Sequence, residues 1–296
     1  MRVFYSDPFE FPLPKGHVFP ADKYRLVRER IERWPAATGV ELVLAPRATR
    51  DELLLVHDAE HVDAFVAGRL DAGHMARIGF PWSSELVERT LRSCGGTLAA
   101  ARAALRDGAS LQLAGGTHHA RRDRGAGYCV FNDCAIAARV VQHEAGIERV
   151  LIVDTDVHQG DGSAAIFAGD DRVFTFSIHG EQPFPAEKAT SDLDVVLPSG
   201  AGDDEYLQRL RDGLAEAFER SRPQFVCWIS GADPFAGDRF GRLKVSKAGL
   251  AERDRLVVAA VRAHGVPFAA TMGGGYAREV ADTVDVYEAT ARALLS

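Results

Sequence analysis

The sequence has few cysteines and no cysteine motif. Its 296 residues include four cysteines, Cys94, Cys129, Cys134 and Cys227, and no two of them form a Cys-x-x-Cys pair. This spacing argues against a thiolate zinc site and against a thioredoxin-like redox site. Scattered thiols are typical of small buried apolar side chains, and here they predict a reducing, cytoplasmic setting.

The sequence also lacks a long apolar run and an excess of positive charge. No stretch approaches the roughly eighteen apolar residues of a membrane span, and residues 1–7 turn polar too early for a signal peptide. The formal net charge is −7, so we expect no nucleic-acid partner and no membrane partner. We interpret the local cluster of Arg121, Arg122 and Arg124 as a solvated loop. Nothing in the sequence indicates an oligomeric state.

Short apolar runs recur along the chain. They are continuous rather than alternating, which is typical of strands buried on both faces of a parallel sheet. The runs are 3–5, 111–114, 150–153, 173–178, 225–229 and 267–272. Amphipathic stretches lie between them, and the main ones are 20–34, 84–106, 133–144, 206–218, 247–264 and 282–295. This alternation predicts one α/β domain, residues 1–296, with helices on both faces of a parallel sheet.

Residues at the ends of these stretches suit helix boundaries. Asp133 is predicted to cap the helix that begins there, and Gly146 to end it. Ser246 is predicted to precede the helix that runs to His264.

Polar and aromatic side chains follow four of the apolar runs directly. Open parallel sheets place their sites at the carboxyl edge of the strands, so we expect these side chains to meet. The segments that follow the runs are 115–119, 154–162, 230–233 and 273–276.

Alternating acidic residues and a histidine predict a metal site. Asp154, Asp156 and His158 share one face if the segment stays extended, and packing them together is costly without a cation. Asp156 and His158 suit two ligands, and Asp233 from another strand end supplies the third. Two oxygens and one nitrogen leave an open position, as a catalytic zinc requires, although Fe(II) would also fit.

A histidine pair and a tyrosine complete the predicted chemistry. His118 and His119 adjoin on a glycine-flanked turn, and Asp154 and Asp161 remain to orient them. An aspartate that accepts from imidazole fixes its tautomer and raises its basicity, so two His–Asp pairs form a general acid/base system. The phenol of Tyr276, after three glycines, is placed to donate to a developing oxyanion.

Five blocks together resemble the histone deacetylase family, in the family's order and over about residues 2–290. The blocks are Gly115-Gly116-Thr117-His118-His119-Ala120, Gly127-Tyr128-Cys129-Val130-Phe131-Asn132-Asp133, Asp154-x-Asp156-x-His158-x-Gly160-Asp161-Gly162, Ser230-Gly231-Ala232-Asp233 with Gly237-Asp238, and Gly273-Gly274-Gly275-Tyr276. Gln159 stands where the main eukaryotic members have a second histidine, which is similar to the class IV and bacterial branch. The resemblance implies the arginase/deacetylase fold, with a central eight-stranded parallel sheet flanked by helices on both faces.

The resemblance also implies roles for single residues. His119 matches the general base and acid, supported by Asp161. His118 matches its electrostatic partner, supported by Asp154. Tyr276 matches the residue that polarises the amide carbonyl. The family's zinc ligands are matched by Asp156, His158 and Asp233.

Further matches concern the surroundings of this site. Arg25 matches an arginine lining an internal acetate channel. The substrate tunnel is matched by Gly127, Tyr128, Phe184, Gly274 and Gly275. A monovalent cation, K⁺, is implied at Asp154, Asp156, His158, Ser177 and Ile178. The rim aspartate with which many members grip a peptide backbone is not evident in the matching stretch, residues 78–82, which argues against histone-like peptide recognition.

Several functions stay open on the sequence alone. The first is a zinc-dependent amidohydrolase that removes acetyl or other acyl groups from lysine side chains. The second is an acetylpolyamine or small-amide deacetylase of the same family. The third is a catalytically inactive binding module, which should lack the ligands, the histidine pair or the tyrosine. A ureohydrolase of the same fold, with two manganese ions, would need more carboxylates than the single Asp233 in residues 230–234.

Overall fold

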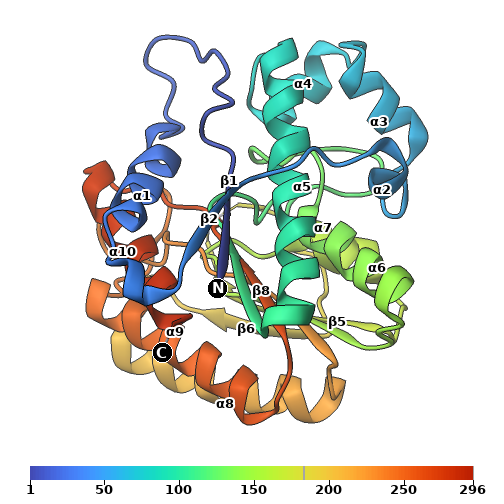
Figure 1. Ribbon diagram of the computed structural model, residues 1–296. Helices are drawn as coiled ribbons and strands as arrows, with labels where there is room; N and C mark the ends of the chain where they lie inside the picture. The colour runs from blue at the N-terminus through green and yellow to red at the C-terminus, as the bar shows by residue number, and fades with distance from the viewer. Residues whose placement is uncertain (183, 296) are drawn as a thin grey trace.

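The computed structural model describes residues 1–182 and 184–295, and one eight-stranded sheet runs through them (Figure 1). Every strand pairing in the sheet is parallel, in the order β2-β1-β3-β8-β7-β4-β5-β6. The strands are β1 Arg2–Tyr5, β2 Glu41–Leu44, β3 Ala109–Gln112, β4 Val150–Asp154, β5 Val173–Gly180, β6 Leu193–Leu197, β7 Phe225–Ile229 and β8 Phe268–Thr271. The predicted eight-stranded parallel sheet is confirmed.

Helices cover both faces of the sheet. α1, α8, α9 and α10 lie on one face, and α5, α6 and α7 lie on the other with the short helices α2 to α4 beyond them (Figure 1). The helices are α1 Asp22–Glu32, α2 Arg50–Leu54, α3 Ala59–Val66, α4 Ala72–Ile78, α5 Ser84–Asp107, α6 Asp133–Ala145, α7 Asp161–Phe167, α8 Asp203–Ser221, α9 Lys247–Ala263 and α10 Val280–Ala293, with a 3₁₀ turn at Ala36–Thr38.

The central strands supply two apolar cores at once. Along β4, Leu151 and Val153 enter the core under α8 and α9, while Val150 and Ile152 enter the core under α5 and α6. Successive side chains of a strand point to opposite faces, so a strand covered on both faces has no face turned to solvent. This explains the continuous apolar runs in the sequence.

The two strands that no apolar run predicted are the edge strands. β2 and β6 pair on one side only, and both include partly exposed and polar positions such as Glu41 and Asp194. With less of their surface buried, they need no continuous apolar run. Edge strands therefore carried too weak a pattern to predict.

One predicted helix cap was wrong. The side chain of Asn132 accepts from the amide of Ala135 at 3.0 Å and caps α6. Asp133 instead accepts from the amides of Gly116 and Thr117, at 3.1 and 2.8 Å, and so holds the turn after β3. The N-cap at Ser246 and the left-handed end of α6 at Gly146 are confirmed.

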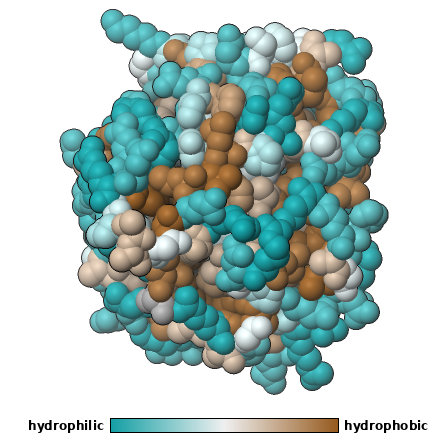
Figure 2. Space-filling view, viewed as in Figure 1, coloured by the Kyte–Doolittle hydropathy of each residue, from teal (hydrophilic) through white to brown (hydrophobic). Residues whose placement is uncertain are grey.

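The outer surface matches the amphipathic pattern of the helices. Figure 2 shows hydrophilic residues over most of the face seen in Figure 1, with hydrophobic residues exposed chiefly in a band near its centre. Within residues 1–182 and 184–295, no helix combines the length and the apolar character that crossing a membrane requires.

Candidate metal centre and active site

The residues singled out from the sequence meet at the carboxyl edge of the sheet. The last residue of β4, Asp154, lies in register with Ile229 at the end of β7, and Ile229 lies in register with Thr271 of β8. The loops that follow these strands therefore start side by side. Residues 154–162, 230–233 and 273–276 thus converge from three neighbouring strands.

Two aspartates and one histidine form a compact, buried cluster. Single ligand atoms of Asp156, His158 and Asp233 all lie within 4.8 Å of one another. Nδ1 of His158 is 3.0 Å from Oδ1 of Asp156 and 3.1 Å from Oδ2 of Asp233. Both aspartates are fully buried, and His158 is 9% exposed.

The electrostatics of this cluster call for a cation. Burial and the charge of Asp156 raise the pKa of Asp233 to about 7, although His158 opposes this. Burial lowers the pKa of His158, but hydrogen bonds to Asp156 and Asp233 outweigh it and raise the pKa to about 10. Two buried carboxylates this close together either retain a proton or bind a metal ion. The donor set of two oxygens and one nitrogen fits zinc with an open position.

The backbone leaves room for the carboxylates and orients them. A Cβ atom at Gly274 would lie 1.8 Å from Oδ2 of Asp233 and 2.9 Å from Oδ2 of Asp156, so only glycine fits. The amide of Gly274 donates to Asp156 at 2.6 Å, and the amide of Val157 donates to Asp233 at 2.9 Å. Such supporting hydrogen bonds fix the direction of ligand oxygens.

The two histidines of the adjacent pair each bind an aspartate. Nδ1 of His118 lies 2.6 Å from Oδ2 of Asp154, and Nδ1 of His119 lies 2.7 Å from Oδ1 of Asp161. The two imidazole rings lie side by side with their centroids 4.1 Å apart. The structure therefore brings the four residues together as two His–Asp pairs beside the cluster of possible ligands.

The two pairs differ in the direction in which the pKa of the histidine is shifted. Burial lowers the pKa of His118, but the charges of Asp154 and Asp156 outweigh it and raise the pKa to about 9. Burial and the charge of His118 lower the pKa of His119 to about 3, despite its bond to Asp161. A neutral His119 is free to accept a proton, whereas a cationic His118 stabilises negative charge.

The interpretation of the arginine cluster as a solvated loop was wrong for two of its members. Nη2 of Arg121 donates to Asp161 at 3.0 Å, on the carboxylate that also binds His119. Arg122 donates to the carbonyls of Val56 and Ile166. These residues fix the loop that carries the histidine pair. Their position directly after the pair was the only signal in the sequence.

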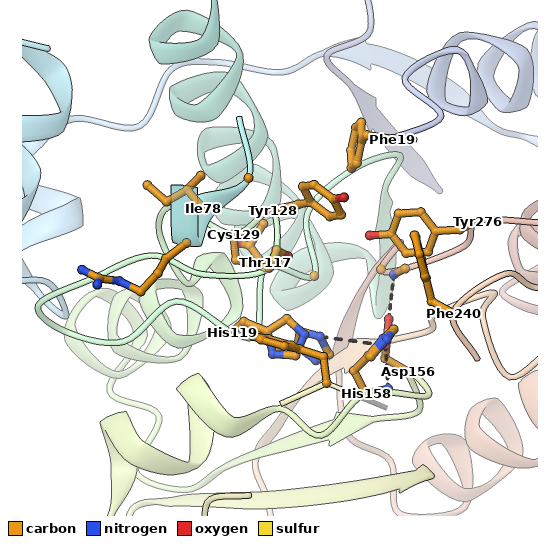
Figure 3. Close-up of a pocket in the computed structure, with 18 of the residues that line it drawn as sticks. Phe19, Ile78, Thr117, His119, Tyr128, Cys129, Asp156, His158, Phe240 and Tyr276 are labelled. Carbon is orange, nitrogen blue, oxygen red and sulfur yellow. Dashed lines mark hydrogen bonds and ion pairs between the residues drawn. The ribbon is translucent and has the colours of Figure 1, made fainter. Parts of the chain in front are cut away.

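A cavity of about 510 Å³ leads from the surface to this cluster. Its floor includes the buried His118, His119 and Asp156, and Figure 3 shows the hydroxyl of Tyr276 pointing into it. Burial raises the pKa of Tyr276 well above its usual value, which keeps the phenol protonated as a donor. The amide of Tyr276 donates to Asp238 at 2.6 Å, which orients the loop.

Aromatic side chains form the walls of the cavity. Tyr128 lies in the left-handed backbone region, with φ of 66°, and its ring is 5.9 Å from that of Tyr276. Phe184 meets the ring of His119 edge-on at 4.8 Å. The sequence did not single out Phe19 and Phe240, which also line the cavity (Figure 3).

Three glycines were predicted in the substrate tunnel, and one of these predictions was wrong. Gly127 and Gly274 line the cavity, but Gly275 does not. A Cβ atom on Gly275 would point at Thr283 and Ala232, at 2.8 and 3.1 Å, because this residue faces α10 rather than the cavity.

The prediction that Arg25 lines an internal channel was also wrong. The side chain of Arg25 is 41% exposed and binds Glu29 and Asp22 on the outside of α1. Two residues earlier, Lys23 is fully buried, and its Nζ donates to the carbonyls of Gly273 and Gly275 at 3.2 and 3.4 Å. Helical periodicity explains the error, because positions two residues apart lie on nearly opposite sides of a helix.

The predicted monovalent-cation residues lie partly together. Asp154 and Ser177 are register partners on β4 and β5, and Ile178 follows Ser177 in the buried part of β5. The hydroxyl of Ser177 lies 3.0 Å from Nδ1 of His179. K⁺ binding there stays a prediction.

Gln159 anchors the segment directly before β6. Its amide donates to the carbonyl of Ala189 and to Asp194, both at 2.9 Å, and its carbonyl accepts from the amide of Ala189 at 2.8 Å. The residue that distinguishes this chain from the main eukaryotic pattern therefore ties the metal-ligand segment to the loop that precedes β6.

Comparisons with known proteins agree with this geometry. Residues 17–291 match the family described as the histone deacetylase domain. The chain is 42% identical to an uncharacterized protein of Picosynechococcus sp., over 95% of this chain and 94% of that protein, and 28% identical to Histone deacetylase 2 of Arabidopsis thaliana, over 96% and 78%. The crystal structure of the HDA15 HD domain shares the fold, with a TM-score of 0.81 at 24% identity over 99% of this chain and 88% of that one. The chain therefore belongs to the histone deacetylase family of hydrolases.

Proposed function

We propose that this chain is a zinc-dependent amidohydrolase that removes acetyl or other acyl groups from lysine side chains. The observation that carries the proposal is the buried cluster of Asp156, His158 and Asp233, directly beside two His–Asp pairs at the floor of a cavity. A metal held there would lower the pKa of a water molecule and polarise a carbonyl. Fe(II) is the alternative metal for the same donors.

The residues of the chain divide the remaining chemistry. His119, neutral and held by Asp161, takes the proton from the attacking water and passes it to the leaving amine. The phenol of Tyr276 donates to the carbonyl oxygen as it becomes negative. His118, cationic and held by Asp154, also stabilises the negative charge that develops on the carbonyl oxygen.

A second, smaller cavity provides space for the product acid. It has a volume of about 60 Å³ and adjoins the first, since both are lined by Phe19, Tyr24 and Tyr128. Arg89 lies in its wall, 8% exposed, and donates to the carbonyl of Ser6. We assign to Arg89 the cationic role that the sequence had suggested for Arg25.

Two further proposals concern conditions. A monovalent cation at Asp154 and Ser177 would reduce the repulsion between buried carboxylates at the end of β4. A reducing, cytoplasmic setting suits the four cysteines, which are all free and buried.

The alternative of an inactive binding module is disfavoured by the complete site. The three candidate ligands, both His–Asp pairs and Tyr276 are all present and buried. An acetylpolyamine deacetylase would use the same residues at the floor of the cavity. The two functions would therefore differ only in which amine the mouth of the cavity binds.

The test is a metal-dependent activity screen. Protein stripped with a chelator and reloaded with Zn²⁺ or Fe²⁺ is assayed on acetyl-lysine peptides, longer acyl-lysine peptides and acetylpolyamines. We expect turnover of acyl-lysine substrates only in the metal-loaded protein. Inactivity on the whole panel, with one metal bound per chain, would contradict the proposal.

Asp233→Ala should remove the metal and with it all measurable turnover, because only two ligands remain. Bound zinc is measured by elemental analysis, and folding by circular dichroism. The matched control is Asp204→Ala, an exposed aspartate in the first turn of α8. Stoichiometric zinc in folded Asp233→Ala protein would remove this residue from the ligand set.

A further inference from the structure

The mouth of the cavity differs from its floor in charge. The exposed residues that line the cavity include two arginines, Arg77 and Arg242, and one other polar side chain, Gln182. Among the described residues that line it, Asp156 is the only carboxylate, and it lies fully buried at the floor. The mouth is therefore cationic, in a chain whose formal net charge is −7.

The two arginines enter the mouth from separate elements. Arg77 lies in the last turn of α4, and the segment that follows is fixed because the amide of Tyr128 donates to the carbonyl of Ile78 at 2.7 Å. Arg242 lies in the segment before α9, where its carbonyl accepts from the amide of Gly200 at 2.8 Å. Figure 3 shows Ile78 and Phe240, their near neighbours in the chain, on opposite sides of the cavity. The backbone positions of both arginines are thus held, while their side chains extend toward solvent.

Neither guanidinium group has a neutralising partner in the described part of the chain. Across residues 1–182 and 184–295, no hydrogen bond or ion pair joins the side chain of Arg77 or Arg242 to a protein acceptor. By contrast, Arg121, close to the same site, is paired with Asp161. Arginine is the side chain best suited to bind a carboxylate, because its planar fork makes two parallel hydrogen bonds.

We propose that this mouth selects acylated amines whose amine part carries a carboxylate beyond the alkyl chain. The inference rests on the proposed function, which directs the amide to the metal cluster and leaves the far end of the amine at the mouth. The carboxylate has two sources of the same chemistry: acidic side chains flanking an acyl-lysine in a peptide, or the free α-carboxylate of an acyl-lysine amino acid. Acetylpolyamines and lysine-rich histone-like segments carry the opposite charge, and the two arginines repel them.

The experiment compares matched substrates on the zinc-loaded protein. One arm uses three acetyl-lysine peptides that differ only in flanks of aspartate, asparagine or lysine. The other arm compares Nε-acetyl-lysine with its α-carboxamide, and N-acetylputrescine serves as the cationic reference. We expect kcat/KM to fall from acidic to neutral to basic flanks, and the difference to shrink at high salt because exposed charges are screened.

Variants assign the preference to the mouth. Arg77→Gln and Arg242→Gln should each reduce the ratio of kcat/KM between acidic and neutral peptides by about two- to fivefold, as expected for exposed ion pairs, and the double variant by more. The matched control is Arg209→Gln, which removes one exposed arginine from α8, and it should leave the ratio unchanged.

The outcomes separate this inference from the proposed function. Hydrolysis of the neutral peptide with equal or better hydrolysis of the basic one would overturn the inference and keep the deacylase. An acidic preference that survives the double variant would also overturn it. If no substrate is turned over, the deacylase proposal fails. The charge preference is then tested by binding alone: we compare the affinity of a carboxylate-bearing hydroxamate with that of its carboxamide partner, for wild type and for the double variant. Equal affinity of the two hydroxamates for wild type would overturn the inference.

Discussion

The floor and the mouth of the cavity are built in different ways. At the floor, His118, His119 and Asp156 are buried, and each side chain is held by at least one short hydrogen bond. At the mouth, Phe184 and Phe240 are 48% and 39% exposed and come from loops. Rigid, mutually paired groups perform chemistry whose geometry must not vary, whereas exposed loop residues adapt to the substrate. We therefore expect substitutions at the floor to abolish turnover and substitutions at the mouth to change substrate choice.

The largest effect within a folded, metal-loaded protein should come from Tyr276→Phe. Loss of a single oxyanion donor typically lowers kcat by about 10²–10³-fold. The aromatic ring keeps its contacts with Phe19 and Phe240, so zinc content and thermal stability should stay at wild-type values. Steady-state kinetics on an acetyl-lysine peptide measure the effect. Unchanged kcat would remove Tyr276 from the mechanism.

Lys23→Met tests whether the buried ammonium group of Lys23 holds the loop that carries Tyr276 in place. Without the ammonium group, the carbonyls of Gly273 and Gly275 lose their donor, and the loop that carries Tyr276 is expected to shift. A displacement of this kind lowers kcat by up to about 10²-fold. Lys23→Arg keeps the charge and is the control, so it should retain more activity than Lys23→Met. Equal activity of the two variants would contradict a role for the charge.

The free energy of unfolding should depend on pH through His57, which is buried and bonded to two segments close to the histidine pair. Its Nδ1 donates to the carbonyl of Arg121, and its Nε2 accepts from the amide of Asn132, at 2.9 Å each. Burial and the nearby His61 lower the pKa of His57 to about 4, from 6.5. Because the folded pKa lies below the unfolded one, the stabilisation is complete above about pH 6.5 and is lost as the pH falls toward 4.

Urea unfolding at two pH values measures this contribution. Between about pH 7.5 and 5, wild type should lose about 2 kcal/mol more of its free energy of unfolding than His57→Gln. His61 titrates in both proteins, so the difference isolates His57. The same pH dependence in both proteins would show that His57 does not titrate as stated.

Of Tyr276→Phe, Lys23→Met and Phe184→Ala, the last, which lies at the mouth, should have the smallest effect. This side chain is half-exposed and touches His119 with its ring edge, so its removal costs about 1 kcal/mol of substrate binding. KM should rise about fivefold while kcat stays nearly constant. A loss of kcat as large as that of Tyr276→Phe would break the distinction between floor and mouth.

The predictions from sequence succeeded and failed for identifiable reasons. Runs such as 150–153 and 225–229 were predicted as strands because burial on both faces makes them continuously apolar. The edge strands β2 and β6 were missed because they are partly solvated. Tyr128 and Phe184 were expected in the tunnel on the strength of a resemblance, and both line the cavity. Arg25 was placed wrongly because a match of residue type ignored the face of α1.

By itself, the sequence determined the fold class and the identity of the reactive groups. Apolar periodicity dictates which segments are buried, and the types of residue at the strand ends dictate what chemistry they support. The sequence also predicted that the reactive groups at the strand ends meet, but only the tertiary structure decided which side chains from the helices and long loops join them. Lys23 contacts the loop before Tyr276, and Arg77 and Arg242 line the same cavity mouth. The sequence could not predict these contacts, because the residues in each pair are at least 165 positions apart in the chain. Distance along a chain carries no information about contacts that the packing of helices on a sheet creates.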